Sequence, residues 1–199
     1  MKYYDSQFPG WPDAMKINVP DINSKETALF TRELKPDLIV VSGTALIKEP
    51  LLSLPVSTGI INLHTGLSPY VKGGPNCTNW CIANNTFQWV GNTIMWLNAG
   101  IDSGNIITTE TVDIQNAPDL NEAHRLVMDH AHHLYLQAIG YLSAAEPPYN
   151  SVLQSSIGKG QLYLSKMWTA GRKKDLLKNW NRRKTFSANE TPKTVSLRN

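Results

Sequence analysis

The sequence predicts an α/β protein with a Rossmann-like, mostly parallel sheet, helices on both of its faces and an antiparallel strand at one end. First, short apolar runs alternate with segments of helical periodicity, which is typical of β-α-β units. Second, the run 37–43 is continuously apolar, which fits a strand buried on both faces. Third, the connection between Asn98 and Asn105 is so short that the strands on either side of it should be antiparallel neighbours.

The predicted strands are bounded by turn residues and are rich in β-branched or aromatic side chains. They cover residues 16–19, 38–42, 60–64, 90–97 and 106–112. Residues 1–13 include prolines, show no period and should be irregular. Asn23 followed by Glu26 resembles a capping box, which predicts the first helix over residues 24–34.

Two further helices are expected in this part of the chain. Gly74 can cap the first of them, with Pro75 in its first turn and Asn84 at its end. Asp119 opens the longest helix, whose apolar residues recur at helical spacing until it ends before Pro147.

The composition changes after residue 148. From Lys159 onward lie 11 of the 19 Lys and Arg residues, against two acidic residues. We therefore divide the chain into a core, 1–148, and a basic C-terminal extension, 149–199. Within the extension we expect a short strand at 160–165, an amphipathic helix at 172–184 and disorder from 185 onward. That helix should place Leu176, Leu177 and Trp180 on one side; its cations can hold RNA, although a solvated terminal helix is favoured.

The overall composition fits a globular protein of 199 residues, 41% hydrophobic and 18% charged. The first residues lack the apolar run of a signal peptide, and the apolar stretch 38–47 is too short to cross a bilayer. We therefore expect a cytoplasmic location and no membrane partner.

Cysteine and histidine residues raise the question of a metal. Cys77 and Cys81 are the two cysteines and lie one helical turn apart, whereas zinc sites usually take four ligands, so a pair of buried thiols is favoured. The long helix carries His124, His130, His132 and His133. Too few carboxylates or thiols lie nearby to complete a site, so we expect a solvated helix face with one histidine against the sheet.

Three polar side chains stand on or beside otherwise apolar strands. Asn62 and His64 project from one face of a strand, whereas Ile61 and Leu63 project from the other. Asp102 follows the next strand, in a turn at a strand end, where α/β proteins bind ligands. Each residue alone could merely finish a strand or cap a turn. Together, an amide, an imidazole and a carboxylate can stabilise an oxyanion and move a proton.

The motifs around these residues resemble one family in their order and spacing. They are Asn62-Leu-His64, Leu67-Ser-Pro69, Gly73 and Ala99-Gly-Ile-Asp102-Ser-Gly-Asn-Ile106. Over residues 17–142 the chain resembles the formyltransferases that use 10-formyltetrahydrofolate, which include methionyl-tRNA, glycinamide ribonucleotide and sugar N-formyltransferases. Thr65 and Gly66 depart from the Pro-Ser of the family, in a loop that shapes the acceptor pocket.

The resemblance implies a formyltransferase fold, catalytic roles for Asn62, His64 and Asp102, 10-formyltetrahydrofolate as co-substrate and no metal. The folate pocket would be formed by Thr44, Ala45, Leu46, Ile47, Leu97, Asn98, Ala99, Gly100, Ile101 and Asp102. The expected reaction is formyl transfer to the primary amine of a small acceptor. We place a nucleotide-linked amino sugar ahead of methionyl-tRNA, because the tRNA enzymes carry a β-barrel where this chain has a short extension.

Family members usually begin with a further β-α-β unit, for which residues 1–16 leave no room. We therefore expect an N-terminally short core. A catalytically inactive remnant that binds folate or a partner is the alternative from another functional class.

Overall fold

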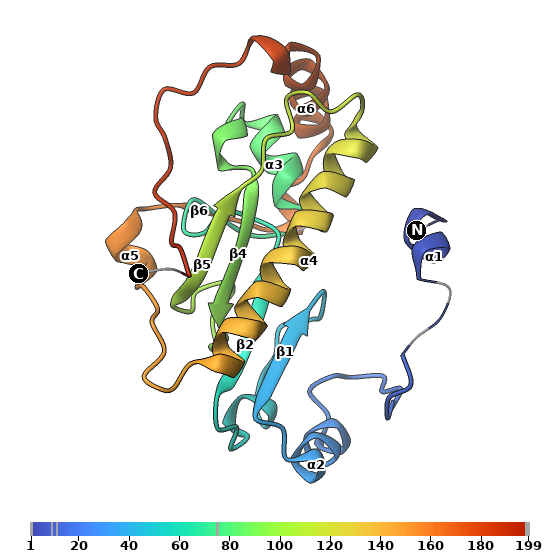
Figure 1. Cartoon of the computed structure of the whole chain (residues 1–199). Helices are drawn as coiled ribbons and strands as arrows, with labels where there is room; N and C mark the ends of the chain where they lie inside the picture. The colour runs from blue at the N-terminus through green and yellow to red at the C-terminus, as the bar shows by residue number, and fades with distance from the viewer. Residues whose placement is uncertain (1, 9, 11, 75, 198–199) are drawn as a thin grey trace.

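A mixed four-stranded sheet forms the centre of the computed structural model, which describes residues 2–8, 10, 12–74 and 76–197 (Figure 1). In spatial order its strands are β1 (Leu38–Ser42), β2 (Gly59–His64), β4 (Gly91–Trp96) and β5 (Ile106–Thr111). β1 and β2 are parallel, whereas β4 pairs antiparallel with both β2 and β5. The predicted α/β class and the antiparallel pairing of β4 with β5 are confirmed.

The antiparallel strand lies in a different place from the one predicted. β4 runs opposite to the other three strands and is interior, because β2 and β5 pair with its two edges. The short connection 97–105 joins β4 to β5, which pairs antiparallel with the outer edge of β4. β5 therefore runs in the same direction as β2.

Three expectations about the N-terminal half are wrong. Residues 16–19 form no strand, and β1 is not buried on both faces, since Val40 is 50% exposed and only Val41 in it is buried. β1 is an end strand of the described sheet, so no further strand pairs with its outer edge. Helix α1 (Lys2–Gln7) also occupies part of the region expected to be irregular, and the Tyr4 hydroxyl donates to Asp129.

Helices cover both faces of the sheet, as predicted. Helix α4 (Leu120–Ala144) lies across one face, where its Ala131, Leu134 and Ala138 pack against Ile61 and Ile94 (Figure 1). Helix α2 (Lys25–Leu34) and the 3-10 turn η1 (Leu51–Ser53) pack against the other face at β1. The Tyr135 hydroxyl of α4 joins β1 to β2, because it accepts from Val41 N–H and bonds the carbonyls of Val41 and Ile61.

A second layer forms where the C-terminal extension packs on helix α3 (Cys77–Ala83). Helix α6 (Ala170–Arg182) buries Leu176 and Trp180 there, whereas Leu177 is 56% exposed, contrary to the predicted apolar side. Strand β6 (Gln161–Tyr163) pairs in parallel with β3 (Val71–Gly73). The remaining elements are α5 (Gln154–Ile157) and the 3-10 turns η2 (Phe87–Trp89), η3 (Ser165–Met167) and η4 (Arg183–Thr185).

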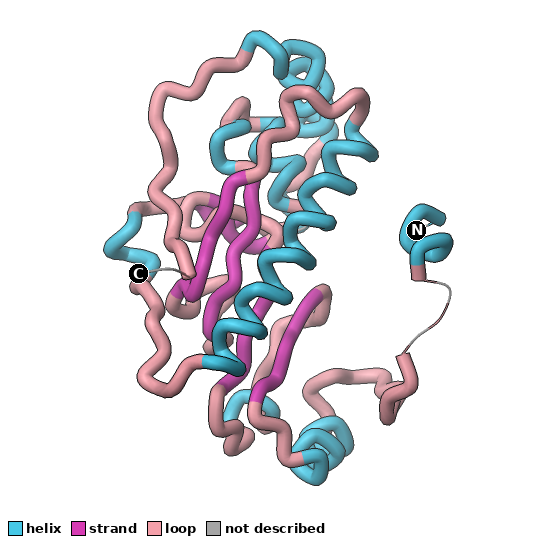
Figure 2. The backbone as a smooth tube through the Cα atoms, in the orientation of Figure 1, coloured by secondary structure: helices cyan, strands magenta, loops and turns pink. Residues whose placement is uncertain are grey.

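Composition alone predicts that the segment after η4 is disordered. In the structure this segment runs alongside β5 (Figure 2). Thr109 N–H and the Thr108 hydroxyl donate to the Val195 carbonyl, and Val195 N–H donates to the Thr109 hydroxyl. Val195 thus lies beside β5, an end strand of the sheet. Among the described residues, no helix combines the length and apolarity needed to cross a membrane.

Capping differs from the prediction at two helices. Ser24 rather than Asn23 caps α2, since its hydroxyl accepts from Thr27 N–H. Asn76 rather than Gly74 caps α3, and Pro75 lies outside the described residues. The long helix begins as predicted, with the Asp119 carboxylate accepting from Glu122 N–H.

Candidate active site

The alternation along β2 presents Asn62 and His64 to one side of the sheet. Ile61 is fully buried and Leu63 is 6% exposed, and both pack in the cluster formed with α4. Asn62 and His64 project from the opposite face and line a cavity. The predicted division of this strand into a packing face and a polar face is therefore confirmed.

Asp102 meets both side chains from the connection between β4 and β5. Its Oδ1 accepts from Asn62 Nδ2 at 3.4 Å, and its Oδ2 lies 3.3 Å from His64 Nδ1. Oδ2 also accepts from Gly73 N–H at 2.8 Å, the shortest of the three contacts. The structure thus brings together the three residues predicted to be catalytic and adds a main-chain donor.

Asp102 adopts a left-handed backbone, with φ of 44°. For most residues with a Cβ this conformation costs roughly 1–2 kcal/mol, and aspartate is among those that tolerate it best. Strain of this kind persists where surrounding contacts fix the residue, and it is concentrated at functional sites. In this conformation the carboxylate reaches Asn62 and His64 of β2.

His64 is 6% exposed and has an acceptor oxygen beside each ring nitrogen. Nε2 lies 3.0 Å from the Val71 carbonyl, and Nδ1 faces Asp102. A neutral imidazole carries one N–H and can donate to one of these oxygens, whereas an imidazolium donates to both. The ring can therefore hold a proton at either nitrogen.

Cys77 and Gly66 pack around the same imidazole. Cys77 Sγ lies 3.7 Å from His64 Nε2 and donates to the Gly73 carbonyl. Burial, together with the charge of Asp102, raises the pKa of the Cys77 thiol to about 12, so the group is a neutral thiol at pH 7. A Cβ on Gly66 would come within 2.4 Å of His64 Nε2, so this position has no room for a side chain while the ring stays where it is.

The polar face of β2 opens into a cavity of about 770 Å³. Nine of the ten predicted folate-binding residues line it: Thr44, Ala45, Leu46, Ile47, Leu97, Asn98, Gly100, Ile101 and Asp102. Ala99, the tenth, is not among the lining residues. Two loops separated by some fifty residues of sequence therefore form one wall next to Asn62 and His64.

The loop that contains residues 44–48 is held in place by Asn23. Its Nδ2 donates to the Leu46 carbonyl at 3.0 Å, and its Oδ1 accepts from Lys48 N–H at 2.7 Å. The amide that sequence reasoning assigned to a helix cap is thus used to fix a cavity wall.

The opposite wall comes from the C-terminal extension, which sequence analysis placed outside the core. Tyr163, Leu164 and Ser165 line the cavity together with Gly73 and Gly74. Gly74 N–H donates to the Tyr163 carbonyl, and a Cβ on Gly73 would lie 2.1 Å from that oxygen, so glycine is required for this approach. The sequence gives one signal for this wall, the short β-like run at 160–165.

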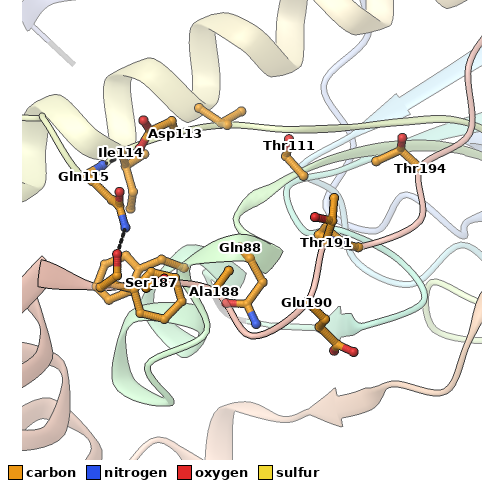
Figure 3. Close-up of a pocket in the computed structure, with 14 residues that line it drawn as sticks. Gln88, Thr111, Asp113, Ile114, Gln115, Ser187, Ala188, Glu190, Thr191 and Thr194 are labelled. Carbon is orange, nitrogen blue, oxygen red and sulfur yellow. Dashed lines mark hydrogen bonds between the residues drawn. The ribbon is translucent and has the colours of Figure 1, made fainter. Parts of the chain in front are cut away.

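A second cavity, of about 550 Å³, lies between β5 and the segment after η4 (Figure 3). It is lined by Thr111 of β5, Asp113 after it, Gln88 of η2, and Thr191 and Thr194 of the segment after η4. Asn62, His64 and Asp102 do not line it. The candidate active site is therefore the larger cavity alone.

The histidines of α4 lie away from both cavities. His130 bonds Asn92 on β4 and Glu110 on β5, which confirms that one histidine contacts the sheet. His124 bonds Asn79, and burial lowers its pKa. Across the described residues, no group of three His, Cys, Asp or Glu side chains is arranged to hold a metal ion. Cys77 and Cys81 are buried free thiols, as expected.

Comparison with known proteins identifies the family from the sequence and the shared fold from solved structures. The sequence profile of the formyl transferase family matches residues 20–139. A methionyl-tRNA formyltransferase from Clostridium beijerinckii is 36% identical over 117 residues, which cover 58% of this chain and 37% of that enzyme. The chain spans between about a third and a half of the length of the curated relatives it matches.

Two solved structures share the fold. One is a formyltransferase from Anoxybacillus kamchatkensis, in complex with a UDP-linked formamido sugar and tetrahydrofolate; it has a TM-score of 0.55 and 20% identity, covering 70% of this chain and 76% of that one. The other is described as a likely sugar N-formyltransferase from Mycobacterium tuberculosis, with a TM-score of 0.60 and 19% identity. It covers 89% of this chain and 80% of its own, so the shared fold reaches beyond residue 148.

Proposed function

Because the chain belongs to the formyl transferase family, we propose that it transfers a formyl group from 10-formyltetrahydrofolate to the primary amine of a small acceptor. The observation that carries this proposal is the contact of Asp102 with both Asn62 and His64 at the wall of the 770 Å³ cavity. An amide donor, an imidazole and a carboxylate are the groups that acyl transfer to an amine needs.

The residues present fit a folate co-substrate. The cavity has the size of small-molecule sites, which are about 300–1,000 Å³, and such sites combine apolar walls with a few polar groups. Ile47 and Leu97 supply apolar surface beside the main-chain groups of the two loops. When bound, 10-formyltetrahydrofolate supplies the activated formyl group.

Each of the three side chains would have its own part in the reaction. Asn62 Nδ2 donates one hydrogen to Asp102 and has a second to donate to a developing oxyanion. His64 can take the proton from the attacking amine or, when protonated, support the oxyanion. Asp102 orients the imidazole through Nδ1 and can hold a water that carries the proton.

The proposed acceptor is a nucleotide-linked amino sugar. Two structural neighbours that cover most of this chain carry sugar-modifying descriptions, and one holds a formylated sugar nucleotide. The C-terminal extension also lines the cavity through residues 163–165, and a cavity of about 770 Å³ suits a small acceptor. Methionyl-tRNA is the second candidate, because the curated relatives act on it by name and α6 exposes Lys173, Lys174 and Lys178.

The test is to incubate the chain with 10-formyltetrahydrofolate and UDP- or dTDP-linked 4-amino sugars and to measure formylated sugar by mass spectrometry. A parallel reaction contains charged initiator methionyl-tRNA. We expect a mass increase on the sugar and none on the tRNA. Formyl-methionine without formylated sugar would reverse the order of acceptors. Binding of 5-formyltetrahydrofolate without turnover of either acceptor would identify an inactive remnant.

A further inference from the structure

We propose that Gln154 is a positioning residue for Asp102, so that the C-terminal extension is part of the catalytic unit. This inference rests on the proposed function, because it assigns Asp102 a part in the reaction. Gln154 Nε2 donates to the carbonyls of Asp102 and Gly104, at 2.8 and 2.9 Å. One side-chain amide therefore bonds the carbonyl of Asp102 itself and that of Gly104, two residues later in the same turn.

The orientation of this amide follows from its surroundings. Its nitrogen has two hydrogens and faces two carbonyl oxygens, which accept them. In the opposite orientation Oε1 would face the same two oxygens with no hydrogen between them. The amide nitrogen must therefore be the atom that points into the turn.

The turn needs such an external support. Asp102 has φ of 44°, a conformation that its own side chain disfavours. Gly104 packs so closely on β4 that a Cβ there would lie 1.7 Å from the Trp96 carbonyl. The two carbonyls that Gln154 holds are those of the strained residue and of the tightly packed glycine, so its donors fix the turn at both points.

Gln154 is itself anchored by the sheet. Two residues before it, Val152 forms an antiparallel bridge with Ile106, and both of its hydrogen bonds are 2.8 Å long. Ile106 begins β5, at the end of the connection that contains Asp102. Val152 of the extension is therefore bonded at one end of this connection, and Gln154 bonds the connection nearer its middle.

A second contact from the extension reaches the same carboxylate through β3. Strand β6 pairs with β3 over residues 71–73, and Gly73 N–H donates to Asp102 Oδ2. Gln154 thus bonds the main chain of Asp102. The pairing of β3 with β6 fixes Gly73, whose N–H bonds the Asp102 carboxylate. Both supports come from residues after position 148, and this places the functional boundary of the core beyond that position.

The test compares Gln154→Leu with Gln137→Leu. The leucine at 154 keeps the volume and removes both donors, whereas Gln137 is exposed on α4 and bonds only His133 among the described residues. We expect Gln154→Leu to lower kcat about tenfold, with KM for the acceptor changed less than about threefold, and Gln137→Leu to leave both unchanged.

A double variant separates positioning from general damage. If Gln154 acts through Asp102, Gln154→Leu should have little further effect in an Asp102→Asn background, so the double variant should be about as slow as Asp102→Asn alone. Independent losses, in which the two factors multiply, would overturn the proposal, and so would a Gln154→Leu enzyme with wild-type kcat.

A measurement on the unchanged protein covers the case in which Gln154→Leu does not fold. Both Nε2 hydrogens are engaged, so the side-chain amide of Gln154 should exchange with solvent much more slowly in NMR than that of Gln137. Equal, fast exchange of the two amides would overturn the proposal. This readout needs no acceptor; absence of formyl transfer in the wild type would instead reject the proposed function.

Discussion

Gly73 N–H donates to the same carboxylate oxygen of Asp102 that lies beside His64 Nδ1. One oxygen therefore receives a main-chain donor from β3 and faces the imidazole of β2. A carboxylate fixed by a backbone N–H loses little freedom when the imidazole changes its protonation state, which favours a constant geometry through proton transfer.

Replacing Asn62 by alanine should affect the chemical step more than binding. If Asn62 donates to the oxyanion, kcat and kcat/KM should fall together by several hundredfold, about 3 kcal/mol, while folate affinity changes little. Steady-state kinetics and titration with 5-formyltetrahydrofolate measure the two effects. Asn181→Ala, on the exposed face of α6, is the control and should be neutral. A loss of folate affinity alone would show that Asn62 is a binding residue.

His64 and Asp102 should behave as one unit. We expect His64→Ala and Asp102→Asn each to slow the reaction strongly, and the double variant to cost much less than the product of the single losses, because both act on one proton. Single-turnover rates give the comparison. A His64→Ala variant with wild-type kcat would show that these residues are only scaffold.

Gly66→Ala should displace the His64 ring. The new methyl group would lie 2.4 Å from His64 Nε2 and 3.0 Å from both Cys77 Cβ and the Val71 carbonyl. We expect a loss of about 1–3 kcal/mol in the free energy of unfolding and a lower kcat. Gly140→Ala on α4 meets no atom within 4 Å and should instead stabilise by about 0.5–1 kcal/mol. Urea denaturation of both variants checks the contrast.

Stability should fall in mild acid because of His124. Burial lowers its folded pKa below the ordinary value of 6.5, so the unfolded chain binds the proton more readily. The stability that comes from keeping His124 unprotonated is fully present above pH 6.5 and is lost as the pH falls through the folded pKa of His124. Urea unfolding at pH 7.5 and 5.5 should show a smaller loss for His124→Gln than for the wild type, whereas the exposed His133→Gln should match the wild type. Equal losses in all three proteins would contradict this assignment.

The Cys77 thiol should resist alkylation in the folded protein. With its pKa raised to about 12, its thiolate fraction at pH 8 is lower than that of an ordinary cysteine by about a thousandfold. Mass spectrometry after iodoacetamide treatment should find Cys77 and Cys81 unmodified in the native protein and both modified in urea. Rapid native labelling at Cys77 would mean that the packing around His64 is open.

The polar face of β2 could be predicted because it depends on local alternation. Asn62 and His64 lie on one side of the strand for the same reason that Ile61 and Leu63 lie on the other. The contact with Asp102 spans 40 residues of sequence and could be expected only from the resemblance to a family.

Contacts made by the C-terminal extension could not be predicted in this way. The position of Gln154 depends on the Val152–Ile106 bridge, which joins segments 46 residues apart and leaves no periodic pattern. Likewise, Asn23 and Ser24 are both good cap residues, and sequence does not show which of them a distant loop recruits. The prediction that Asn23 caps α2 is wrong because the Asn23 side chain instead bonds the distant loop at residues 46 and 48.

The two hydrogen bonds of Asn23 also bear on how the proposed folate pocket can be redesigned. They join the Leu46 carbonyl and the Lys48 N–H, which are main-chain groups. Substitutions at 46 and 48 keep these groups, except that proline at 48 would remove the N–H. The shape of this loop is therefore encoded at position 23, while the side chain at 46, which is 40% exposed, is open to variation. Libraries that vary the lining of this cavity can diversify position 46 and keep Asn23 fixed.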